Sequence, residues 1–420
     1  MKNTKPEIRF KRFSEEWEEK ELGKVGKTFT GLSGKTKDDF GHGIGKFVTY
    51  MNVYSNSVSN PSMTEPIEID KKQNEVKTGD VFFTTSSETI EEVGMSSVWL
   101  DNTENVYLNS FCFGYRPTEN FDNYYLAYML RSTVMRKKIT FLGQGISRYN
   151  ISKNRLLELT IPKPRLSEQT QIGNFFKNLD NLITLHQQKY EKLVNVKKAM
   201  LEKMFPKNGA HVPEIRFKGF SGAWEEKTLG EVTFYTKGFA FKSEHFTTDG
   251  KRIIRVSDLG VDNIRNDSEK IFISDENING LEKYKIHKNE IIITTVGSKP
   301  ELIESAVGRG ILVRESEVGY LNQNSLKITN SNFVNNGFVY GLLNSKDYGN
   351  HILQIQRGNA NQSNITVSDL FEFKIKIPTL SEQEKIGNYF ISLDNLLTLH
   401  QGELGKLKNI KKAMLEKMFV

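Results

Sequence analysis

The segment Gly31-Leu-Ser-Gly-Lys-Thr36 contains residue types that could bind a phosphate group. A P-loop, however, begins with a glycine, followed by four residues of any type and then Gly-Lys-Ser/Thr. In this sequence Phe29 stands where the first glycine should be. The next residues, 37–43, are a poor helix start, so a bound phosphate would meet no helix N-terminus. We therefore do not predict an ATP site. Lys35 and Lys37 remain candidates for contact with a phosphate backbone, the alternative being an ordinary solvated loop.

Other patterns that could do chemistry are incomplete. The run Gly41-His-Gly-Ile-Gly45 matches a dinucleotide fingerprint only in its glycine count. No Asn-Pro-Pro-Tyr or Asp-Pro-Pro-Tyr run occurs, so the usual pocket for methylating an exocyclic amine is missing. The seven histidines show no metal-ligand spacing, and the single Cys112 excludes a zinc site built on cysteines. Nothing singles out a nucleophile among the serines. The sequence thus predicts neither a catalytic site nor a metal site.

The composition is that of a folded protein, with 37% hydrophobic and 26% charged residues among 420. The formal net charge of +7 permits nucleic-acid binding without requiring it. No apolar run is long enough to predict a membrane span, and the first residues lack the apolar core of a signal peptide. A lone cysteine suits a reducing compartment, so we expect a cytoplasmic protein.

The chain is a tandem duplication. Residues 6–25 and 213–232 are identical at 15 of 20 positions, and residues 167–205 and 381–419 at 27 of 39. Between these stretches only faint echoes survive: 46–52 align with 251–257, 80–85 with 290–295, and 107–109 with 320–322. We therefore expect two domains with one fold and different surfaces, which suggests one task carried out on two different targets.

The two variable regions, 1–166 and 207–380, have the pattern of α+β domains. Runs of β-branched and aromatic residues predict strands at 46–53, 81–85, 252–256, 291–296 and 371–377. One helical pattern ends each region, near 121–139 and 333–352. The conserved stretches 167–206 and 381–420 are predicted to be long helices. The expected fold class is therefore α+β, with two tandem α/β domains joined by two long helices.

The conserved stretches show a heptad pattern of apolar residues. Ser167 and Ser381 are suitable N-caps, and Ser381 with Glu384 forms a capping box. We call the line of apolar residues along each predicted helix its seam. We expect the two seams to pack on each other rather than each on its own domain. His186 and His400 are interpreted as polar residues that fix the register of the helix pair. The expected seam residues are Ile172, Phe176, Leu179, Ile183, His186, Tyr190, Leu193 and Met200, and Ile386, Phe390, Leu393, Leu397, His400, Leu404, Leu407 and Met414.

Nucleic-acid contact is expected from loops of the variable regions, because the basic residues are spread evenly along the chain. Both copies carry a Gly/Asn/Gln-rich loop after the helical pattern, at 143–150 and 357–364. Amide side chains can pair with adenine and arginine with guanine, although an ordinary polar turn is the alternative. The basic cluster Arg131, Arg136, Lys137 and Lys138 is interpreted as a solvated face. The candidate contact residues are Lys35, Lys37, Tyr50, Asn52, Ser86, Ser87, Thr89, Gln144, Ser147, Arg148, Tyr149, Asn150, Lys237, Lys242, Arg255, Ser257, Ser298, Lys299, Arg357, Asn359, Asn361 and Gln362.

The conserved stretches resemble a known family. Ile161-Pro…Ser167-Glu-Gln…Ile172…Leu179-Asp180, with its twin Ile377-Pro…Ser381-Glu-Gln…Ile386…Leu393-Asp394, is similar to the conserved regions of the specificity subunit of type I restriction–modification enzymes. The resemblance implies target-recognition domains at 1–166 and 207–380, with spacer helices at 167–206 and 381–420. It also implies that each domain recognises one half of an asymmetric, bipartite DNA site, and that the helices pair antiparallel as a coiled coil and set the gap.

The resemblance further implies a chain without catalytic activity of its own. Two modification subunits would methylate adenine N6 with S-adenosylmethionine, and two restriction subunits would add ATP-driven, Mg-dependent translocation and cleavage. This chain would hold no cofactor and would position the partners on double-stranded DNA. Two alternatives stay open: a stand-alone DNA methyltransferase, and a helical scaffold that does not bind DNA.

Overall fold

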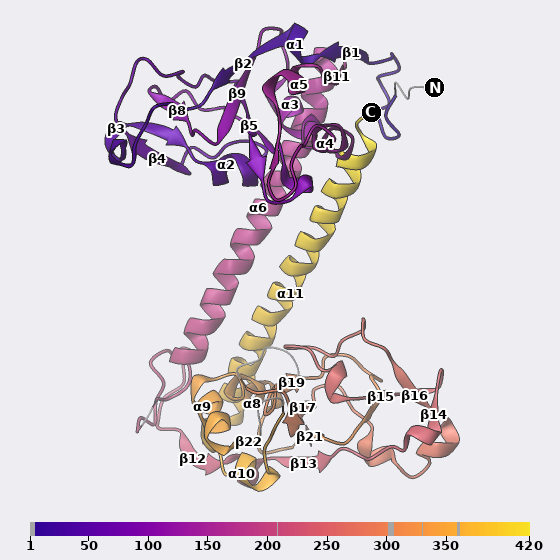
Figure 1. Ribbon diagram of the computed structural model, residues 1–420. Helices are drawn as coiled ribbons and strands as arrows, with labels where there is room; N and C mark the ends of the chain where they lie inside the picture. The colour runs from indigo at the N-terminus through magenta and orange to yellow at the C-terminus, as the bar shows by residue number, and fades with distance from the viewer. Residues whose placement is uncertain (1–4, 208, 301–305, 330, 359–361) are drawn as a thin grey trace. The chain divides into compact units, whose positions relative to one another are not determined.

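The computed structural model describes residues 5–207, 209–300, 306–329, 331–358 and 362–420 (Figure 1). The chain forms two compact units. Unit 1 comprises the described residues up to Gln187 together with Gln401–Val420, and unit 2 comprises those within Gln188–His400. The long helices α6 (Leu166–Lys203) and α11 (Leu380–Lys417) are each divided between the units. No helix among the described residues combines the length and apolarity needed to cross a bilayer.

Both long helices begin one residue earlier than expected. The backbone N–H groups of Glu168 and Gln169 donate to the Arg165 carbonyl, and those of Glu382 and Gln383 donate to the Thr379 carbonyl. Ser167 and Ser381 therefore lie inside the first turn, and the prediction that they are N-caps is wrong.

Unit 1 contains two main sheets and a group of short helices. One sheet has the strand order β2-β9-β5-β7 and the other the order β4-β3-β8, in which β3 and β8 are parallel. Two short pairs, β1 with β11 and β10 with β6, complete the unit. The elements are β1 (Glu18–Glu21), α1 (Leu22–Val25), β2 (Gly26–Thr30), η1 (Lys37–Asp39), β3 (Phe40–Val48), α2 (Tyr50–Ser55), β4 (Thr64–Ile67), β5 (Val81–Thr84), β6 (Ser86–Ser87), η2 (Ile90–Glu92), β7 (Ser96–Val98), β8 (Val106–Leu108), β9 (Cys112–Pro117), α3 (Asn123–Met129), α4 (Thr133–Thr140), β10 (Tyr149–Asn150), α5 (Lys153–Leu157) and β11 (Thr160–Lys163).

Unit 2 repeats this architecture. Its sheets have the orders β13-β21-β17-β19 and β14-β16-β15-β20, with β15 parallel to β20. The elements are β12 (Glu225–Thr228), α7 (Leu229–Val232), β13 (Phe234–Lys237), η3 (Ser243–His245), β14 (Phe246–Thr247), β15 (Lys251–Ile254), η4 (Val256–Asp258), β16 (Ile271–Ile273), η5 (Asp275–Ile278), η6 (Glu282–Tyr284), β17 (Ile291–Thr294), β18 (Val296–Gly297), β19 (Gly310–Leu312), β20 (Tyr320–Leu321), β21 (Ser325–Thr329), α8 (Asn336–Leu342), α9 (Lys346–Ile355), β22 (Arg357–Gly358), β23 (Ser363–Asn364), α10 (Val367–Phe371) and β24 (Lys374–Ile377).

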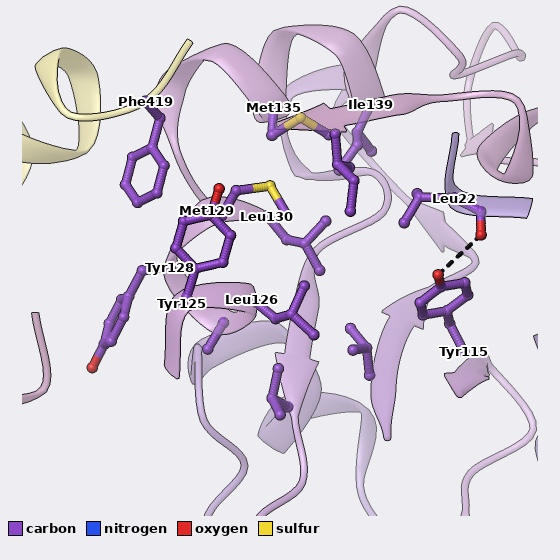
Figure 2. Close-up of a cluster of buried hydrophobic side chains, with 14 of the residues drawn as sticks. Leu22, Tyr115, Tyr125, Leu126, Tyr128, Met129, Leu130, Met135, Ile139 and Phe419 are labelled. Atoms are coloured by element: carbon purple, nitrogen blue, oxygen red, sulfur yellow. Dashed lines mark hydrogen bonds between the residues drawn. The ribbon is translucent and has the colours of Figure 1, made fainter. Parts of the chain in front are cut away.

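The core of unit 1 lies between the β5 sheet and helices α3, α4 and α6. Figure 2 shows the side chains of α3 packed together, with Phe419 from the C-terminal end of the chain beside Tyr125. The Tyr115 hydroxyl donates to the Leu22 carbonyl at 3.0 Å, which satisfies the one polar atom that this tyrosine brings into the core. Burial raises the pKa of Tyr115, so the hydroxyl stays a neutral donor.

The helical pattern at the end of each variable region forms two helices instead of one. In unit 1 the Ser132 hydroxyl accepts from the Met135 N–H and starts α4, and in unit 2 Ser345 does the same for Tyr348 and α9. Serine at an N-cap satisfies a backbone donor and so allows a new helix to begin after a break. The strand expected at 46–53 is also shorter, because β3 ends at Val48 and α2 comes next.

The structure shifts one of the internal alignments by one residue. Phe47 lies opposite Tyr107 in unit 1, and Ile253 lies opposite Tyr320 in unit 2, so Phe47 corresponds to Ile253 and not to Arg252. A shift of one residue reverses the face of every side chain in a strand. The alignment of 80–85 with 290–295 is confirmed: Asp80 and Glu290 precede equivalent central strands, and each accepts from the backbone N–H three residues earlier.

The helix of each repeat packs against the other helix inside both units. In unit 1 the rings of Phe176 and Phe419 stack with centroids 5.7 Å apart, and Lys411 forms an ion pair with Asp180. In unit 2 Phe205 stacks on Phe390 at 5.8 Å, and Lys197 forms an ion pair with Asp394. Residue numbers rise along one helix as they fall along the other, so the helices are antiparallel in each unit. The fold is α+β with two tandem domains and two long helices, as expected.

The seam is most deeply buried where each helix packs on its own domain as well as on the other helix. The Phe176 ring, for example, lies 5.1 Å from the Tyr128 ring of α3, so the expectation that the seams pack on each other rather than on their own domains is wrong for these positions. Ile172, Phe176 and Leu179 are buried in unit 1, and Ile386, Phe390 and Leu393 are buried in unit 2. The remaining expected seam positions are partly or fully buried, while their helical neighbours are mostly exposed. They are Ile183, His186, Tyr190, Leu193, Met200, Leu397, His400, Leu404, Leu407 and Met414.

Candidate nucleic-acid interface

The repeated Ser-Glu-Gln motif attaches the long helix to its domain. In unit 1 the buried Glu168 carboxylate accepts two hydrogen bonds from Arg9 at 2.7 and 2.8 Å and one from the Trp17 indole at 3.2 Å. The Gln169 side chain accepts from the Asp122 N–H at the start of α3. A Cβ on Gly173 would lie 2.4 Å from the Asp122 carboxylate, so only glycine lets the two helices approach this closely.

Unit 2 repeats the arginine and glutamine contacts but not the indole contact, since the Trp224 indole N–H has no hydrogen-bond partner. Arg216 donates twice to Glu382 at 2.7 Å, and Gln383 accepts from the Asn335 N–H at the start of α8. A Cβ on Gly387 would lie 2.6 Å from the Asn335 side chain. The motif that is most similar between the copies is therefore structural, and the surfaces that differ between them lie elsewhere.

Two predicted contact segments of unit 1 lie side by side. Strand β10 pairs antiparallel with β6, so that Tyr149 is opposite Ser87 and Asn150 opposite Ser86. Gln144 and Asn150 exchange two backbone hydrogen bonds at 3.0 and 2.9 Å, which closes residues 144–150 into a hairpin. We call this the unit 1 hairpin. The side chains of Gln144, Ser147, Arg148 and Asn150 are exposed, and Tyr149 is partly buried.

Unit 2 has a hairpin in the same place. Strand β23 pairs with β18 and with β22, so that Asn364 is opposite both Val296 and Arg357. A positive-φ glycine comes directly after the first paired residue in both hairpins, Gly145 at +145° and Gly358 at +159°. A Cβ there would lie 1.9 Å from the Arg148 carbonyl oxygen or 2.1 Å from that of Gln362. Both hairpins therefore need glycine, although the rest of their sequences differ.

A cavity of about 370 Å³ lies beside the unit 1 hairpin. Its walls are side chains of α2, the turn after β6, the turn before β9, and Arg148 of the hairpin. The Tyr50 hydroxyl donates to the Ser86 carbonyl at 2.9 Å, and its ring stacks on Tyr54. Burial is the main cause that raises the pKa of Tyr50, so it stays neutral. The lining residues are Tyr50, Met51, Tyr54, Ser86, Ser87, Glu88, Glu92, Phe111 and Arg148.

Five of these lining residues were not predicted from the sequence: Met51, Tyr54, Glu88, Glu92 and Phe111. The Tyr54 hydroxyl donates to Glu92, and this hydrogen bond is the main cause that lowers the pKa of the Glu92 carboxyl. Phe111 and Met51 are exposed although they are apolar. An aromatic side chain in the short turn Asn109–Cys112 could have marked this site, because such turns usually carry polar residues.

Asn52 was predicted to contact DNA, and this is wrong. Its side chain is fully buried, with 0% exposure, because its amide nitrogen donates to the Asn60 and Met63 carbonyls and its oxygen accepts from the Asn60 N–H. The corrected alignment pairs Asn52 with Asp258, which is also buried. Both residues hold their own loops in shape. Ser87 is buried as well, and its hydroxyl donates to the Thr89 carbonyl.

The other candidates of unit 1 divide between the hairpin and a separate loop. Ser86 and the exposed Thr89 belong to the hairpin region. Lys35 lies in the separate loop, and its ammonium is 2.9 Å from Asp70 and 3.6 Å from Asp39. Lys37, two residues on, is exposed. Lys35 is therefore held by carboxylates of its own unit, whereas Lys37 is exposed to solvent.

In unit 2 the candidates also separate. Lys299 and Gln362 are exposed, and Ser298 is partly buried next to the hairpin. The Arg357 guanidinium is 2.9 Å from Asp369. Lys237, Lys242 and Ser257 are exposed in other segments. Arg255 is bound to Asp258 and to the Glu269 carbonyl, so its guanidinium has a structural role. Asn359 and Asn361 lie outside the described residues.

The basic cluster in and just before α4, which begins at Thr133, is not a simple solvated face. The Arg131 guanidinium donates to the carbonyls of Ser96, Val53, Tyr54 and Asn56 at 2.6–2.9 Å. Arg136 donates to three carbonyls of residues 91–94. Burial lowers the pKa of each to about 10, which leaves both charged at neutral pH. Arg131 binds the C-terminal carbonyls of α2 and so fixes the helix that carries Tyr50.

Each unit thus presents exposed amide and cationic side chains on a hairpin segment that pairs with a short strand. Such groups can donate to and accept from base edges and phosphates. No cluster of histidine, cysteine and carboxylate side chains suited to a metal ion occurs in the described ranges.

Comparisons with known proteins match each repeat of the chain to one family. The family model for the type I restriction modification DNA specificity domain matches twice, at residues 14–195 and 222–409. The putative type I restriction enzyme MjaX specificity subunit of Methanocaldococcus jannaschii is 25% identical over 420 residues, which are 96% of this chain and 92% of that protein. The MjaVIII specificity subunit of the same organism is 26% identical over 299 residues, covering 70% of this chain and 68% of the relative.

Among solved structures, the crystal structure of the type I restriction-modification system S subunit from M. genitalium superimposes with a TM-score of 0.59 at 18% identity, covering 99% of both chains. This likeness concerns the fold. The two family-model matches together span most of the sequence, one on each repeat. The chain therefore belongs to the type I restriction–modification DNA specificity family and carries two copies of its domain.

Proposed function

We propose that the two units recognise the two halves of one bipartite, asymmetric DNA site, and that this chain positions partner subunits for adenine N6 methylation and for cleavage. The observation that carries the proposal is a contrast within the chain. The helices are identical at 27 of 39 positions and are anchored by equivalent Arg–Glu pairs, whereas the hairpins occupy the same place and differ in sequence. A shared frame with different contact surfaces is suited to one task on two sequences. The recognition domains would be 1–166 and 207–380, with the helices at 167–206 and 381–420 setting the gap.

Exposed leucines on the two long helices support the proposal that two copies of one partner bind this chain. Leu182 and Leu185 of α6 are 43% and 44% exposed, and their repeat equivalents Leu396 and Leu399 of α11 are 43% and 55% exposed. Leucines three residues apart lie on one face of a helix. Because the same apolar pair recurs in both repeats outside the seam, it suits a partner that binds twice. We assign these faces to two modification subunits.

The chemistry would belong to the partners. S-adenosylmethionine would be bound by the modification subunits, and ATP with Mg by two restriction subunits. This chain would contribute phosphate contacts that hold its register on the duplex and base-edge contacts that select the sequence. The target adenine would leave the stack toward the modification subunit.

Methylation mapping tests the proposal. N6-methyladenine would be located in the DNA of cells that carry this chain with its partner subunits, and in cells that lack only this chain. We expect methylation at one bipartite motif with an unspecified gap, lost when the chain is absent. Methyl transfer by the purified chain alone would favour a stand-alone methyltransferase. Absence of salt-dependent duplex binding by the assembled complex would favour a scaffold that does not bind DNA.

A further inference from the structure

One residue of the unit 1 hairpin does not fit the polar character of its neighbours. Ile146 is 97% exposed, the highest value among the large hydrophobic side chains of the described residues. It lies between Gly145 and Ser147, at the tip of a loop whose other exposed side chains are polar. A scattered exposed aliphatic residue needs no explanation on a protein surface. This one, however, is placed where contact with base edges is proposed.

Backbone hydrogen bonds attach the base of the hairpin that carries Ile146 to unit 1. The two backbone hydrogen bonds between Gln144 and Asn150 close the loop, and β10 joins it to β6. The Ile151 N–H donates to the Thr85 carbonyl at 3.0 Å, directly after the central strand β5. The base of the hairpin is therefore attached to unit 1 next to strand β5, which limits the conformational entropy lost when Ile146 makes a contact.

Apolar surface continues beside the hairpin. Met51 and Phe111 are 54% and 65% exposed, and they line the same cavity as Arg148, which is two residues from Ile146. The hairpin and the cavity beside it thus combine one cation, the carboxylates of Glu88 and Glu92, several amide and hydroxyl groups, and an apolar side chain at the tip. In the major groove, the one apolar group that distinguishes a base pair is the 5-methyl group of thymine.

We infer that Ile146 contacts the 5-methyl group of a thymine in the half-site bound by unit 1, and so selects a T·A pair there. The inference rests on the proposed function and adds a residue that determines specificity. The second hairpin, residues 357–364, has no aliphatic residue larger than alanine in its sequence, so the contact belongs to one half of the site.

The test removes the methyl group from the DNA and the side chain from the protein. The full chain, assembled with its modification subunits, is titrated with duplexes of the mapped site in which each thymine in turn is replaced by deoxyuridine. For the unaltered chain we expect one deoxyuridine position to weaken binding about fourfold, the change expected for one buried methyl-sized group. Ile146→Ala should bind the thymine and deoxyuridine duplexes equally at that position, and Ile146→Val should keep part of the difference.

Ile44→Ala is the matched control. Ile44 is 87% exposed in strand β3 of the same unit, outside the hairpin, so its replacement should leave the deoxyuridine effect unchanged. The inference is overturned if no deoxyuridine position weakens binding, if Ile146→Ala keeps the full difference, or if the half-site of unit 1 contains no thymine on either strand. A complex that binds no defined site would instead refute the proposed function itself.

Discussion

Lys411 and Asp180 form an ion pair of 2.5 Å between residues 231 positions apart, and Lys197 and Asp394 form its counterpart, also at 2.5 Å. Lys197 and Lys411 are equivalent in the repeat, as are Asp180 and Asp394. Each repeat therefore supplies the lysine of one pair and the aspartate of the other. The first pair lies within unit 1 and the second within unit 2, so each unit is completed by the helix of the other repeat.

The two aspartates should differ in their importance for stability. Asp394 is 1% exposed and accepts from Tyr340 at 2.8 Å and Arg314 at 2.9 Å in addition to its contact with Lys197. Asp394→Ala leaves these buried groups without their anion, and we expect a loss of about 3–5 kcal/mol in the free energy of unfolding. Burial, the largest cause that raises the pKa of Tyr340, remains in this variant, so the tyrosine does not supply the lost negative charge.

Asp180→Ala is the matched comparison. Asp180 is 32% exposed and is bonded to Tyr128 and Lys411, so solvent can replace part of the contact. We expect a loss of about 1–3 kcal/mol. Urea denaturation of both variants measures the difference, and equal losses would contradict the burial argument.

The hairpins should act on separate halves of the DNA site. Arg148→Ala or Gln144→Ala should relax base choice in one half only, and Gln362→Ala in the other half only, because the hairpins belong to different units. Asn361 lies outside the described residues, and we expect Asn361→Ala to have the same effect as Gln362→Ala. A lost base contact costs about 1–3 kcal/mol. Binding to site variants randomised at each position measures this, and an equal change in both halves would rule out modular recognition.

The loop that carries Lys35 should resist acid. A hydrogen bond from Lys35 is the main cause that lowers the pKa of Asp70 to about 2 from its usual 3.8. A carboxyl whose pKa is lowered in the folded state stabilises the loop above about pH 4, and this contribution is lost as the pH falls through 2. Near neutral pH Lys35 therefore stays paired.

Lys37→Ala should reduce the salt dependence of DNA binding more than Lys35→Ala does, and the reverse order would show that Lys35 leaves its carboxylates to bind phosphate.

The repeat, the long helices and their seam could be predicted from the sequence because identity and heptad spacing are local signals. The structural role of Glu168, Gln169 and Gly173 could not be predicted from the sequence. Each of them contacts a residue far away in the chain, such as Arg9 or Asp122. Asn52 was misassigned for a related reason. A polar residue whose amide satisfies backbone groups of its own loop has the same sequence signature as one that contacts a base.

The hairpin positions were predicted because glycine and amide clusters mark turns, and both copies carry one at the same point. Their pairing with β6 and β18 depends on tertiary structure and has no sequence signal. Arg131 shows the limit in the other direction: a basic run suggests solvent exposure, but its guanidinium binds four carbonyls in the fold.

A half-length chain, residues 1–206, is expected to form a working dimer. In such a dimer Lys197 of one copy could pair with Asp180 of the other, and Phe205 could occupy the place that Phe419 has in unit 1, because the repeat makes these residues equivalent. Two identical domains would recognise an inverted repeat. The measurement is methylation mapping with the modification subunits. Phe205→Ser should prevent assembly, whereas Phe141→Ser, at an exposed phenylalanine outside the helix contacts, should not.

The last prediction concerns the gap between the half-sites. Met204 and Phe205 are buried in unit 2, so the length of the helices is best changed at the unit boundary within each helix, after Gln187 in α6 and after His400 in α11. Four residues of good helix formers inserted at both points lengthen each helix by about 6 Å and keep its two ends in their own units. Because one base pair rises about 3.4 Å, the unread gap should grow by one or two base pairs while both half-site sequences stay the same.

The insertion also rotates the downstream part of each helix by about 40°, which tracking of the groove can partly absorb. In a matched variant lengthened in α6 alone, α6 and α11 should pair poorly, because the ion pairs Lys411–Asp180 and Lys197–Asp394 could not both form. Methylation mapping of the double insertion measures the gap and the half-sites together, and an unchanged gap in an active complex would refute the role of the helices as the spacer.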